Sequence, residues 1–282
     1  MTPAPPGSFP PAQWRLLITS PAAGAWNMAV DEAILKAVGQ ELSLPTLRLF
    51  AWEPACLSLG YAQPSSDVDK GRLTERGWHL VRRPTGGRAI LHTDELTYSV
   101  IGPLNDPRLA GSVLDSYRCL ATALLDSLHR LNIPAESNPS PASPSSAPKG
   151  PVCFEVPSNY EITVAGKKLL GSAQARRKEG LLQHGTLPLF GDLTRITQVL
   201  AFSDEADRES AAVRLQSRAT TAEQVLGSTL SWETAAEAFI VSFQDVLNLE
   251  LIPSDLLPQE LKRAEQLVRE KFNHPSWTEK AN

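Results

Sequence analysis

Two stretches of the chain carry apolar residues at the spacing of an amphipathic helix. One lies at 25–40 and a longer one at 112–133. The stripe of the first consists of Met28, Ala29, Ala33, Ile34 and Val38. Asp31 and Glu32 lie in the first half of that stretch, where the helix dipole favours acidic side chains. Both stretches are predicted to be helices.

Shorter apolar runs bounded by turn-forming residues predict strands. The expected strands lie at 14–21, 46–52, 55–61, 95–102 and 180–189, with strand–loop–strand units at 78–92 and 160–177. The runs at 46–52 and 55–61 are expected to pair with each other around a turn at Glu53-Pro54.

From about residue 192 onward the pattern becomes helical. Helices are expected at 192–202, 221–227, 231–248 and 258–272, and a short one earlier at 67–76. Ser231 with Thr234 marks the start of the third of these. Because strands come first and helices mostly gather later, the order predicts an α+β or mixed α/β domain with a helical C-terminal part.

Two stretches hold too few apolar residues to pack. Residues 134–150 are largely Pro, Ser and Ala and are expected to form a mobile loop, and residues 1–12 a disordered extension. The rest is predicted to divide into a main domain at 13–203 and a helical region at 204–282.

Composition narrows the class of protein. The chain has 282 residues, of which 42% are hydrophobic, and a net charge of −4. This balance argues against non-specific binding to nucleic acid or to a membrane surface. We find no apolar run long enough to span a bilayer and no secretory signal, and three widely spaced cysteines fit a reducing cytoplasm. No CxxC pair occurs, so a structural zinc site is not expected.

The stretch RRPTGGRAILH, residues 82–92, is the first candidate for chemistry. Adjacent glycines between two strands let a ligand approach the backbone, and three arginines flank them. A tight turn with solvated arginines explains the same residues. Neither the P-loop spacing nor GxGxxG is present.

The stretch YEITVAGKKLLGSAQ, residues 160–174, predicts a hairpin that turns at Ala165-Gly166. Side chains alternate along a strand, so Lys167 and Lys168 should point to opposite faces, one toward a pocket and one toward water. A solvated hairpin edge is the simpler interpretation of such a pair. Gly171 and Ser172 follow where a strand would favour bulk, which indicates that something approaches the backbone there.

Cys153 lies between the Pro/Ser stretch and this hairpin. Free cysteines are often small buried hydrophobes, and Cys56 in an apolar strand and Cys119 on a helix are interpreted as structural. The position of Cys153 outside regular structure favours a different role.

Several ordered motifs resemble a known family. RRPTGGRAILH, ELTYSV, CFEVPSNYEI, GKKLLGSAQARR and LLQHGTL together resemble the lipoate–protein ligase A and biotin ligase superfamily, and more narrowly its octanoyltransferase branch, LipM. The similarity runs from about Trp14 to Leu189. It implies a biotin/lipoate ligase catalytic domain with a mixed, largely antiparallel sheet flanked by helices.

The resemblance also implies a reaction. Such enzymes take octanoate from octanoyl-acyl carrier protein, hold it as a thioester on the motif cysteine, and pass it to a lysine of a lipoyl domain, typically that of the glycine cleavage H protein. Transfer from a thioester to an amine is downhill, so neither ATP, a metal nor another cofactor is expected.

Carried onto this sequence, the resemblance makes Cys153 the nucleophile and Lys168 the pocket lysine. The residues expected to shape or line the acyl site are Arg83, Gly86, Gly87, His92, Ser172, Gln174 and His184. The residues hypothesised to form a basic docking rim for the acidic carrier protein are Arg82, Arg88, Arg176, Arg177 and Lys178.

Three alternatives remain. An ATP-dependent lipoate ligase would need no nucleophilic cysteine, and its glycine loop usually reads closer to RR-S-GGGAV-HD than to the sequence at 82–93. An enzyme that moves octanoyl groups between lipoyl domains more often carries C-P-G-S-Y-D, where this chain has Cys153-Phe154-Glu155-Val156-Pro157-Ser158. A non-catalytic carrier-binding module would not need Cys153 and Lys168.

Overall fold

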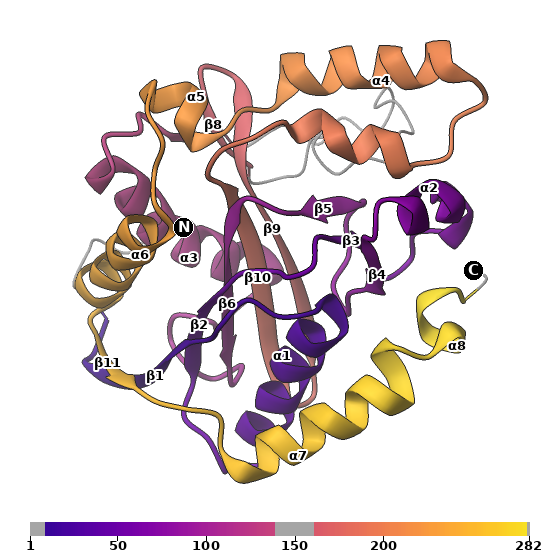
Figure 1. The fold of residues 1–282 in the computed structure, drawn as a ribbon. Helices are drawn as coiled ribbons and strands as arrows, with labels where there is room; N and C mark the ends of the chain where they lie inside the picture. Colours follow the sequence, from indigo (N-terminus) through magenta and orange to yellow (C-terminus); the bar gives the residue numbers. More distant parts are fainter. Residues whose placement is uncertain (1–8, 139–160, 281–282) are drawn as a thin grey trace.

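A mixed sheet forms the centre of the computed structural model, which describes residues 9–138 and 161–280 (Figure 1). Its eight strands lie in the order β11-β1-β2-β6-β10-β9-β8-β7. They are β1 (Ala12–Ile18), β2 (Thr46–Phe50), β6 (Glu95–Gly102), β7 (Glu136–Asn138), β8 (Glu161–Val164), β9 (Lys167–Arg177), β10 (Gly180–Pro188) and β11 (Leu249–Pro253). β1 is parallel to β11 and β2, and the other five neighbouring pairs are antiparallel. The expected sheet type is confirmed.

A second sheet of three strands lies beside the first, in the order β4-β3-β5. Its strands are β3 (Cys56–Leu59), β4 (His79–Arg82) and β5 (Ile90–His92). The predicted pairing of 46–52 with 55–61 is therefore wrong. β2 has β1 on one edge and β6 on the other, so no edge remains for β3, which pairs with β4 and β5 instead.

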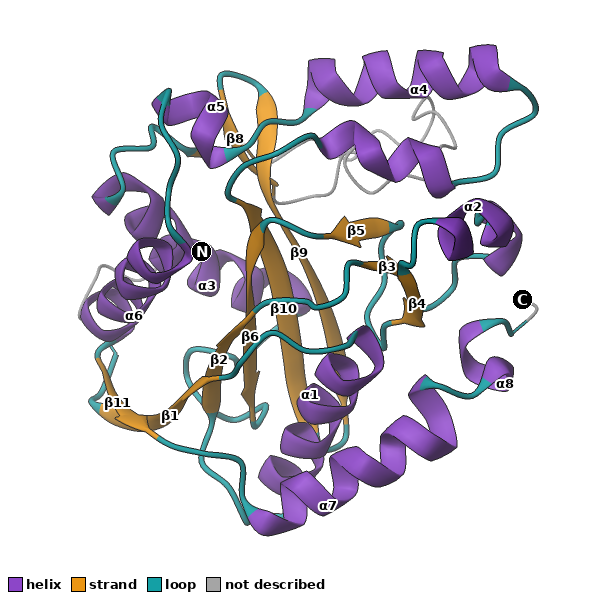
Figure 2. Cartoon of the chain, viewed as in Figure 1, coloured by secondary structure: helices purple, strands orange, loops and turns teal. Residues whose placement is uncertain are grey.

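Helices cover both faces of the main sheet (Figure 2). The helical segments are α1 (Gly24–Gly39), η1 (Ser65–Asp67), α2 (Lys70–Glu75), α3 (Val113–Arg130), η3 (Leu193–Val199), α4 (Glu205–Arg218), α5 (Ala222–Leu226), α6 (Trp232–Leu247), α7 (Pro258–Leu267), η4 (Val268–Phe272) and α8 (Pro275–Thr278). α1 lies on one face with α7 packed outside it, while α3 and α6 pack together on the other. Ser231 caps α6 by accepting the Thr234 backbone N–H, as predicted.

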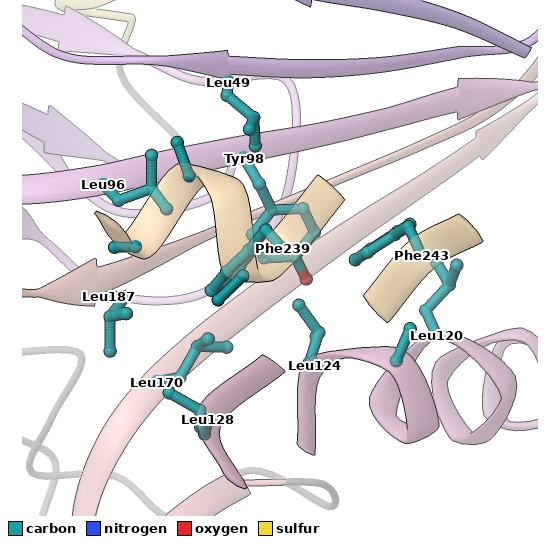
Figure 3. Packing of buried hydrophobic residues seen from close by; sticks show 14 of the residues in the cluster. Leu49, Leu96, Tyr98, Leu120, Leu124, Leu128, Leu170, Leu187, Phe239 and Phe243 are labelled. Atoms are coloured by element: carbon teal, nitrogen blue, oxygen red, sulfur yellow. The ribbon is translucent and has the colours of Figure 1, made fainter. Parts of the chain in front are cut away.

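Side chains alternate along β6, and this alternation separates a core from a polar face. Leu96, Tyr98 and Val100 belong to the core beneath α3 and α6, where Phe239 and Phe243 pack against the Tyr98 ring (Figure 3). Thr97 and Ser99 point to the other face, toward α1 and the small sheet. The same strand thus closes a hydrophobic core and supplies hydroxyl groups to the opposite side.

The hairpin of β8 and β9 forms as predicted. Ala165 and Gly166 both have positive φ, at 48° and 78°. Two such residues in succession give the tight turn whose twist matches that of the flanking strands. Lys167 is consequently exposed, whereas Lys168 is 3% exposed.

Three segments differ from the sequence prediction. Within the expected N-terminal extension, Phe9 packs on the core and its carbonyl oxygen accepts from Asn248 Nδ2 at 2.8 Å, so residues 9–12 are ordered. Within the expected loop 134–150, Glu136–Asn138 forms strand β7, because the edge of β8 offers it backbone hydrogen bonds; residues 139–150 lie outside the described part. The C-terminal region also contributes strand β11 to the sheet, and α4 was not predicted.

We predict that Phe239→Ala lowers the free energy of unfolding by about 3–5 kcal/mol, because it leaves a cavity between α6 and the sheet. Denaturant unfolding measures this loss. The matched control is Val213→Ala on α4, where the side chain is 66% exposed and the change should stay within about 0.5 kcal/mol. Equal effects of the two substitutions would contradict the assigned core.

Candidate functional site

A cavity of about 120 Å³ lies between the α1 face of β9 and β10 and the loop that joins β4 to β5. Its lining residues are Met28, Trp52, Arg83, Gly87, Arg88, Ile90, His92, Thr97, Lys168, Gly171, Ser172, Ala173, His184, Gly185 and Thr186. Met28, Trp52 and Ile90 make part of the wall apolar, while the charged groups come from the loop and from β9. Such a slot suits a ligand with an apolar chain and one polar end.

Lys168 is a buried cation at the wall of this cavity. Its side chain is 4% exposed, and Nζ donates to Glu161 Oε1 at 2.8 Å. The lysine side chain passes close to Gly171, where an added β-carbon would lie 3.1 Å from Lys168 Cε. Gly171 therefore leaves room for the lysine side chain, which explains the small residue that the sequence pattern singled out.

Arg83 fixes the glycine loop, residues 84–88. It donates from Nε and Nη2 to Gly86 O at 3.2 and 2.9 Å, and from Nη2 to Arg88 O at 2.7 Å. Its Nη1 donates to Ser58 O and Oγ, which ties the loop to β3. Gly87 has a φ of +93°, a conformation that other residues rarely adopt. A buried guanidinium and the conformational freedom of glycine therefore both contribute to the shape of the loop.

His92 belongs to a buried chain of hydrogen bonds along the cavity wall. Its Nδ1 lies 2.6 Å from Glu95 Oε1 and its Nε2 lies 2.8 Å from Ser58 Oγ. Trp52 stacks on the imidazole with ring centroids 3.9 Å apart, and Trp52 Nε1 donates to Thr97 Oγ1 at 2.8 Å. These bonds fix the orientation of the His92 ring.

His184 links the glycine loop to α1. Its Nε2 lies 2.6 Å from Thr85 Oγ1, and its Nδ1 lies 3.5 Å from Asp31 Oδ2. Burial lowers the pKa of His184, and the Asp31 carboxylate opposes this only in part. For Asp31, burial by itself would raise the pKa, but Arg48 and His184 outweigh it and the pKa lies below its usual value. The resting pair is therefore a neutral imidazole beside a carboxylate.

The structure brings most of the predicted site residues together. Those that line the cavity are Arg83, Gly87, His92, Lys168, Ser172 and His184. Gly86 contributes its carbonyl oxygen to Arg83 and is not among the lining residues of the described chain. Gln174 donates to Ser116 Oγ and Gln183 Oε1, on the α3 side of the sheet, so the structure does not bring it to the cavity. Cys153 lies outside the described residues.

The hypothesised basic rim does not form as a unit. Arg82 is fully buried and donates to backbone carbonyl oxygens, so it cannot serve as a docking residue. Arg176 donates to Leu109 O and Ser116 Oγ near the far end of β9. Of the five proposed residues, only Arg88 lines the cavity. In the sequence these five basic residues are alike, because the burial of a side chain depends on tertiary contacts.

Sequence reasoning missed several residues of the site. Trp52 and Met28 belong to segments that read as ordinary strand and helix. Asp31 was assigned to the helix dipole, whereas it forms a buried ion pair with Arg48 at 2.8 Å. Glu161, the partner of Lys168, lies within the CFEVPSNYEI motif. That motif is the sequence feature from which Glu161 could be predicted as a site residue.

Comparison with known proteins gives a family match over most of the chain. A family model described as the lipoyl protein ligase A/B catalytic domain matches residues 23–244. Octanoyltransferase LipM of Brevibacillus brevis is 37% identical over 270 residues, covering 94% of this chain and 98% of the relative. Octanoyltransferase LipM of Kyrpidia tusciae is 40% identical over 263 residues, covering 90% and 94%.

Solved structures share the fold. The bi-partite lipoate protein ligase of Thermoplasma acidophilum superposes with a TM-score of 0.79 at 23% identity, covering 95% of this chain and 96% of that one. Lipoate-protein ligase A bound with ATP gives a TM-score of 0.77 at 24% identity, covering 95% and 98%. The expected lipoate ligase type of catalytic fold is confirmed. None of the helices in the described part of the chain has the length and apolar character needed to cross a bilayer.

We predict that His184→Gln weakens the rise of stability with pH. The pKa of His184 is lowered by folding, so the unfolded chain takes up a proton first as pH falls. The contribution of His184 is therefore complete above the unfolded pKa of about 6.5 and is lost as pH falls toward the folded pKa. Unfolding free energies at pH 5 and pH 7 should differ less in the variant than in the parent. Exposed His79→Gln is the control and should keep the parent's pH dependence.

Proposed function

The chain belongs to the lipoyl protein ligase A/B catalytic domain family and to its octanoyltransferase LipM branch, and we propose that it transfers octanoyl groups through a thioester on Cys153. Members of this branch are acyltransferases of lipoate biosynthesis, and so is this chain. The observation that carries the proposal is the buried Lys168 ammonium at a cavity whose wall is partly apolar. The donor, the acceptor and the thioester step are part of the proposal.

The other two cysteines are poor candidates for the nucleophile. Cys56 is fully buried in β3, where burial raises the pKa of its thiol far above the usual value. Cys119 on α3 is half-buried, and burial raises the pKa of its thiol to about 12. A thiol acts as a nucleophile in its deprotonated form, so both are unreactive near neutral pH. This leaves Cys153 of the chain's three cysteines.

Two balanced steps make up the proposed reaction. The Cys153 thiolate attacks the carbonyl carbon of the donor thioester, the donor C–S bond breaks, and the donor sulfur leaves as a thiol with the proton that Cys153 gave up. An acceptor lysine amine then attacks the acyl-Cys153 carbonyl, a C–N bond forms, and the C–S bond to Cys153 breaks. The proton of the amine returns to the thiolate, so no ATP is consumed.

Lys168 suits two tasks in these steps. Its ammonium stabilises a nearby thiolate electrostatically, and a buried lysine can also pass a proton between the sulfur and the attacking amine. Glu161 holds Nζ in place from the neighbouring strand β8. Backbone N–H groups of Gly87 or Ser172, at the cavity wall, are candidate donors to the oxyanion.

We propose octanoyl-acyl carrier protein as the donor and a lipoyl-domain protein, such as the glycine cleavage H protein, as the acceptor. The apolar wall formed by Met28, Trp52 and Ile90 suits the hydrocarbon tail, since each buried CH₂ contributes up to about 0.8 kcal/mol. Free thiols at Cys56 and Cys119 fit a reducing cytoplasm, to which we assign the reaction.

We predict that the protein gains the mass of one octanoyl group when incubated with octanoyl-acyl carrier protein in the absence of ATP. Cys153→Ala should abolish the adduct, because the nucleophile is removed. Intact-protein mass spectrometry gives the answer. Cys119→Ala is the matched control and should keep the adduct, since burial raises the pKa of that thiol to about 12. No adduct in the parent, together with modification of a lipoyl domain that needs octanoate and ATP, would establish a ligase instead.

We also predict that Lys168→Arg slows transfer to the lipoyl domain by about 10²–10⁴-fold, because arginine keeps the charge but does not release a proton. The acyl-enzyme should still form and should accumulate. Quenched time courses that follow both the adduct and the modified lipoyl domain separate the two steps. Lys167→Arg at the exposed neighbouring position should behave like the parent; parent-like transfer in Lys168→Arg would exclude the proton relay.

A further inference from the structure

One arginine joins the C-terminal end of the described chain to residues 60–63. Arg82 is the last residue of β4 and is fully buried. Its guanidinium donates to five carbonyl oxygens that belong to two segments far apart in the sequence, residues 60–63 and 277–278. Among the described residues no carboxylate forms an ion pair with it. The Arg82 guanidinium therefore binds backbone carbonyl oxygens rather than neutralising a carboxylate of the described residues.

The two sets of hydrogen bonds use different nitrogens. Nη1 donates to Gly60 O at 2.8 Å, to Tyr61 O at 3.2 Å and to Gln63 O at 2.5 Å. Nε donates to Trp277 O at 3.0 Å and Nη2 to Thr278 O at 3.0 Å. The Trp277 indole N–H donates in return to Arg82 O at 2.9 Å. A planar guanidinium can hold acceptors on several sides at once, which a lysine ammonium cannot reproduce.

Residues 60–63 in turn support the glycine loop. Tyr61 N donates to Thr85 O at 2.8 Å. The backbones approach so closely that a β-carbon at Gly60 would lie 1.9 Å from Gly87 O. Gly87 and Arg88 line the cavity, so a shift of residues 60–63 would move the cavity wall.

Aromatic contacts strengthen the same connection. The Tyr61 and Trp277 rings lie 5.7 Å apart between centroids, and Lys280 Nζ lies 3.4 Å from the Tyr61 centroid. Phe272, the last residue of η4, packs edge-on against Trp277 and so ties α8 to η4. An exposed ion pair between Lys70 and Glu279, at 2.6 Å, also reaches this segment. Exposed pairs of this kind contribute little, which makes Lys70 a useful comparison.

We propose that Arg82 and Trp277 are positioning residues for the acyl site. Through them, the C-terminal segment 275–280 holds residues 60–63 and the glycine loop in place. Arg82 and Arg83 are neighbours on the chain with different tasks. Arg83 binds the glycine loop directly, whereas Arg82 acts on the loop through residues 60–63. The assignment of the cavity as an acyl site rests on the proposed function, whereas the support of the glycine loop by Arg82 and Trp277 does not.

The test compares Arg82→Lys and Trp277→Ala with Lys70→Met. The first two should lower the rate constant of acyl-enzyme formation at saturating octanoyl-acyl carrier protein by about tenfold or more, because small misplacements of a catalytic wall have effects of this size. The donor concentration for half-maximal rate should change by less than roughly threefold. Trp277→Phe keeps the ring but loses the N–H, so it should recover part of the rate. Lys70→Met should match the parent.

A second measurement keeps the inference separate from the proposed function and from simple loss of folding. Amide hydrogen exchange, read by mass spectrometry on peptides that contain Tyr61 or the glycine loop, should be faster in Arg82→Lys and Trp277→Ala and unchanged on β1 and α6. Parent-like exchange in these peptides would overturn the inference, even if the parent forms no acyl-enzyme. Faster exchange in every peptide, with a parent-like rate per folded molecule, would also overturn it, because Arg82 would then only stabilise the fold.

Discussion

The buried ion pair of Arg48 and Asp31 is the contact on which the site depends. Both side chains are fully buried, and Arg48 also donates to Asn27 Oδ1 and to Thr19 Oγ1. Taking two charges out of water is costly unless every polar atom finds a partner, and here the partners come from α1, β2 and the segment after β1. The pair therefore fixes α1 on the sheet in one position. Asp31 also accepts from Ser99 Oγ at 2.7 Å, which extends the constraint to β6.

Side-chain contacts connect this ion pair to the cavity. His184 lies beside Asp31 and contacts Thr85, so the position of α1 influences the glycine loop. Hydroxyl groups on β6 and β10 occupy the same face, whereas the other face of β6 packs against Phe239 and Phe243. The alternation of strand side chains thus gives one sheet a largely apolar face that stabilises the fold and a polar face that lines the cavity. A wall whose side chains are held by several hydrogen bonds suits the acyl transfer that we propose, because the transition state of such a reaction needs fixed donors.

The glycine loop is held from several directions because it has little structure of its own. Gly86 and Gly87 lower the conformational free energy of the unusual loop backbone, but they also leave the loop free to move. Contacts from Arg83, from Thr85 and from the backbone of residues 60–63 remove that freedom. A functional site on such a loop keeps its geometry only when the surrounding residues hold the loop in place. The C-terminal segment belongs to these contacts, although it is the part of the chain farthest in sequence from the loop.

The sequence alone determined the features that depend on local periodicity. The alternation of Lys167 and Lys168, the turn at Ala165-Gly166, the start of α6 at Ser231 and the motifs that identify the family all follow from neighbouring residues. Only the tertiary structure decided which strands pair, since β2 and β3 look alike until the edges of β2 are occupied. It also decided that Arg82 is buried and Arg88 lines the cavity, and that Gln174 faces α3. Burial and pairing depend on contacts between distant segments, and these are absent from any local pattern.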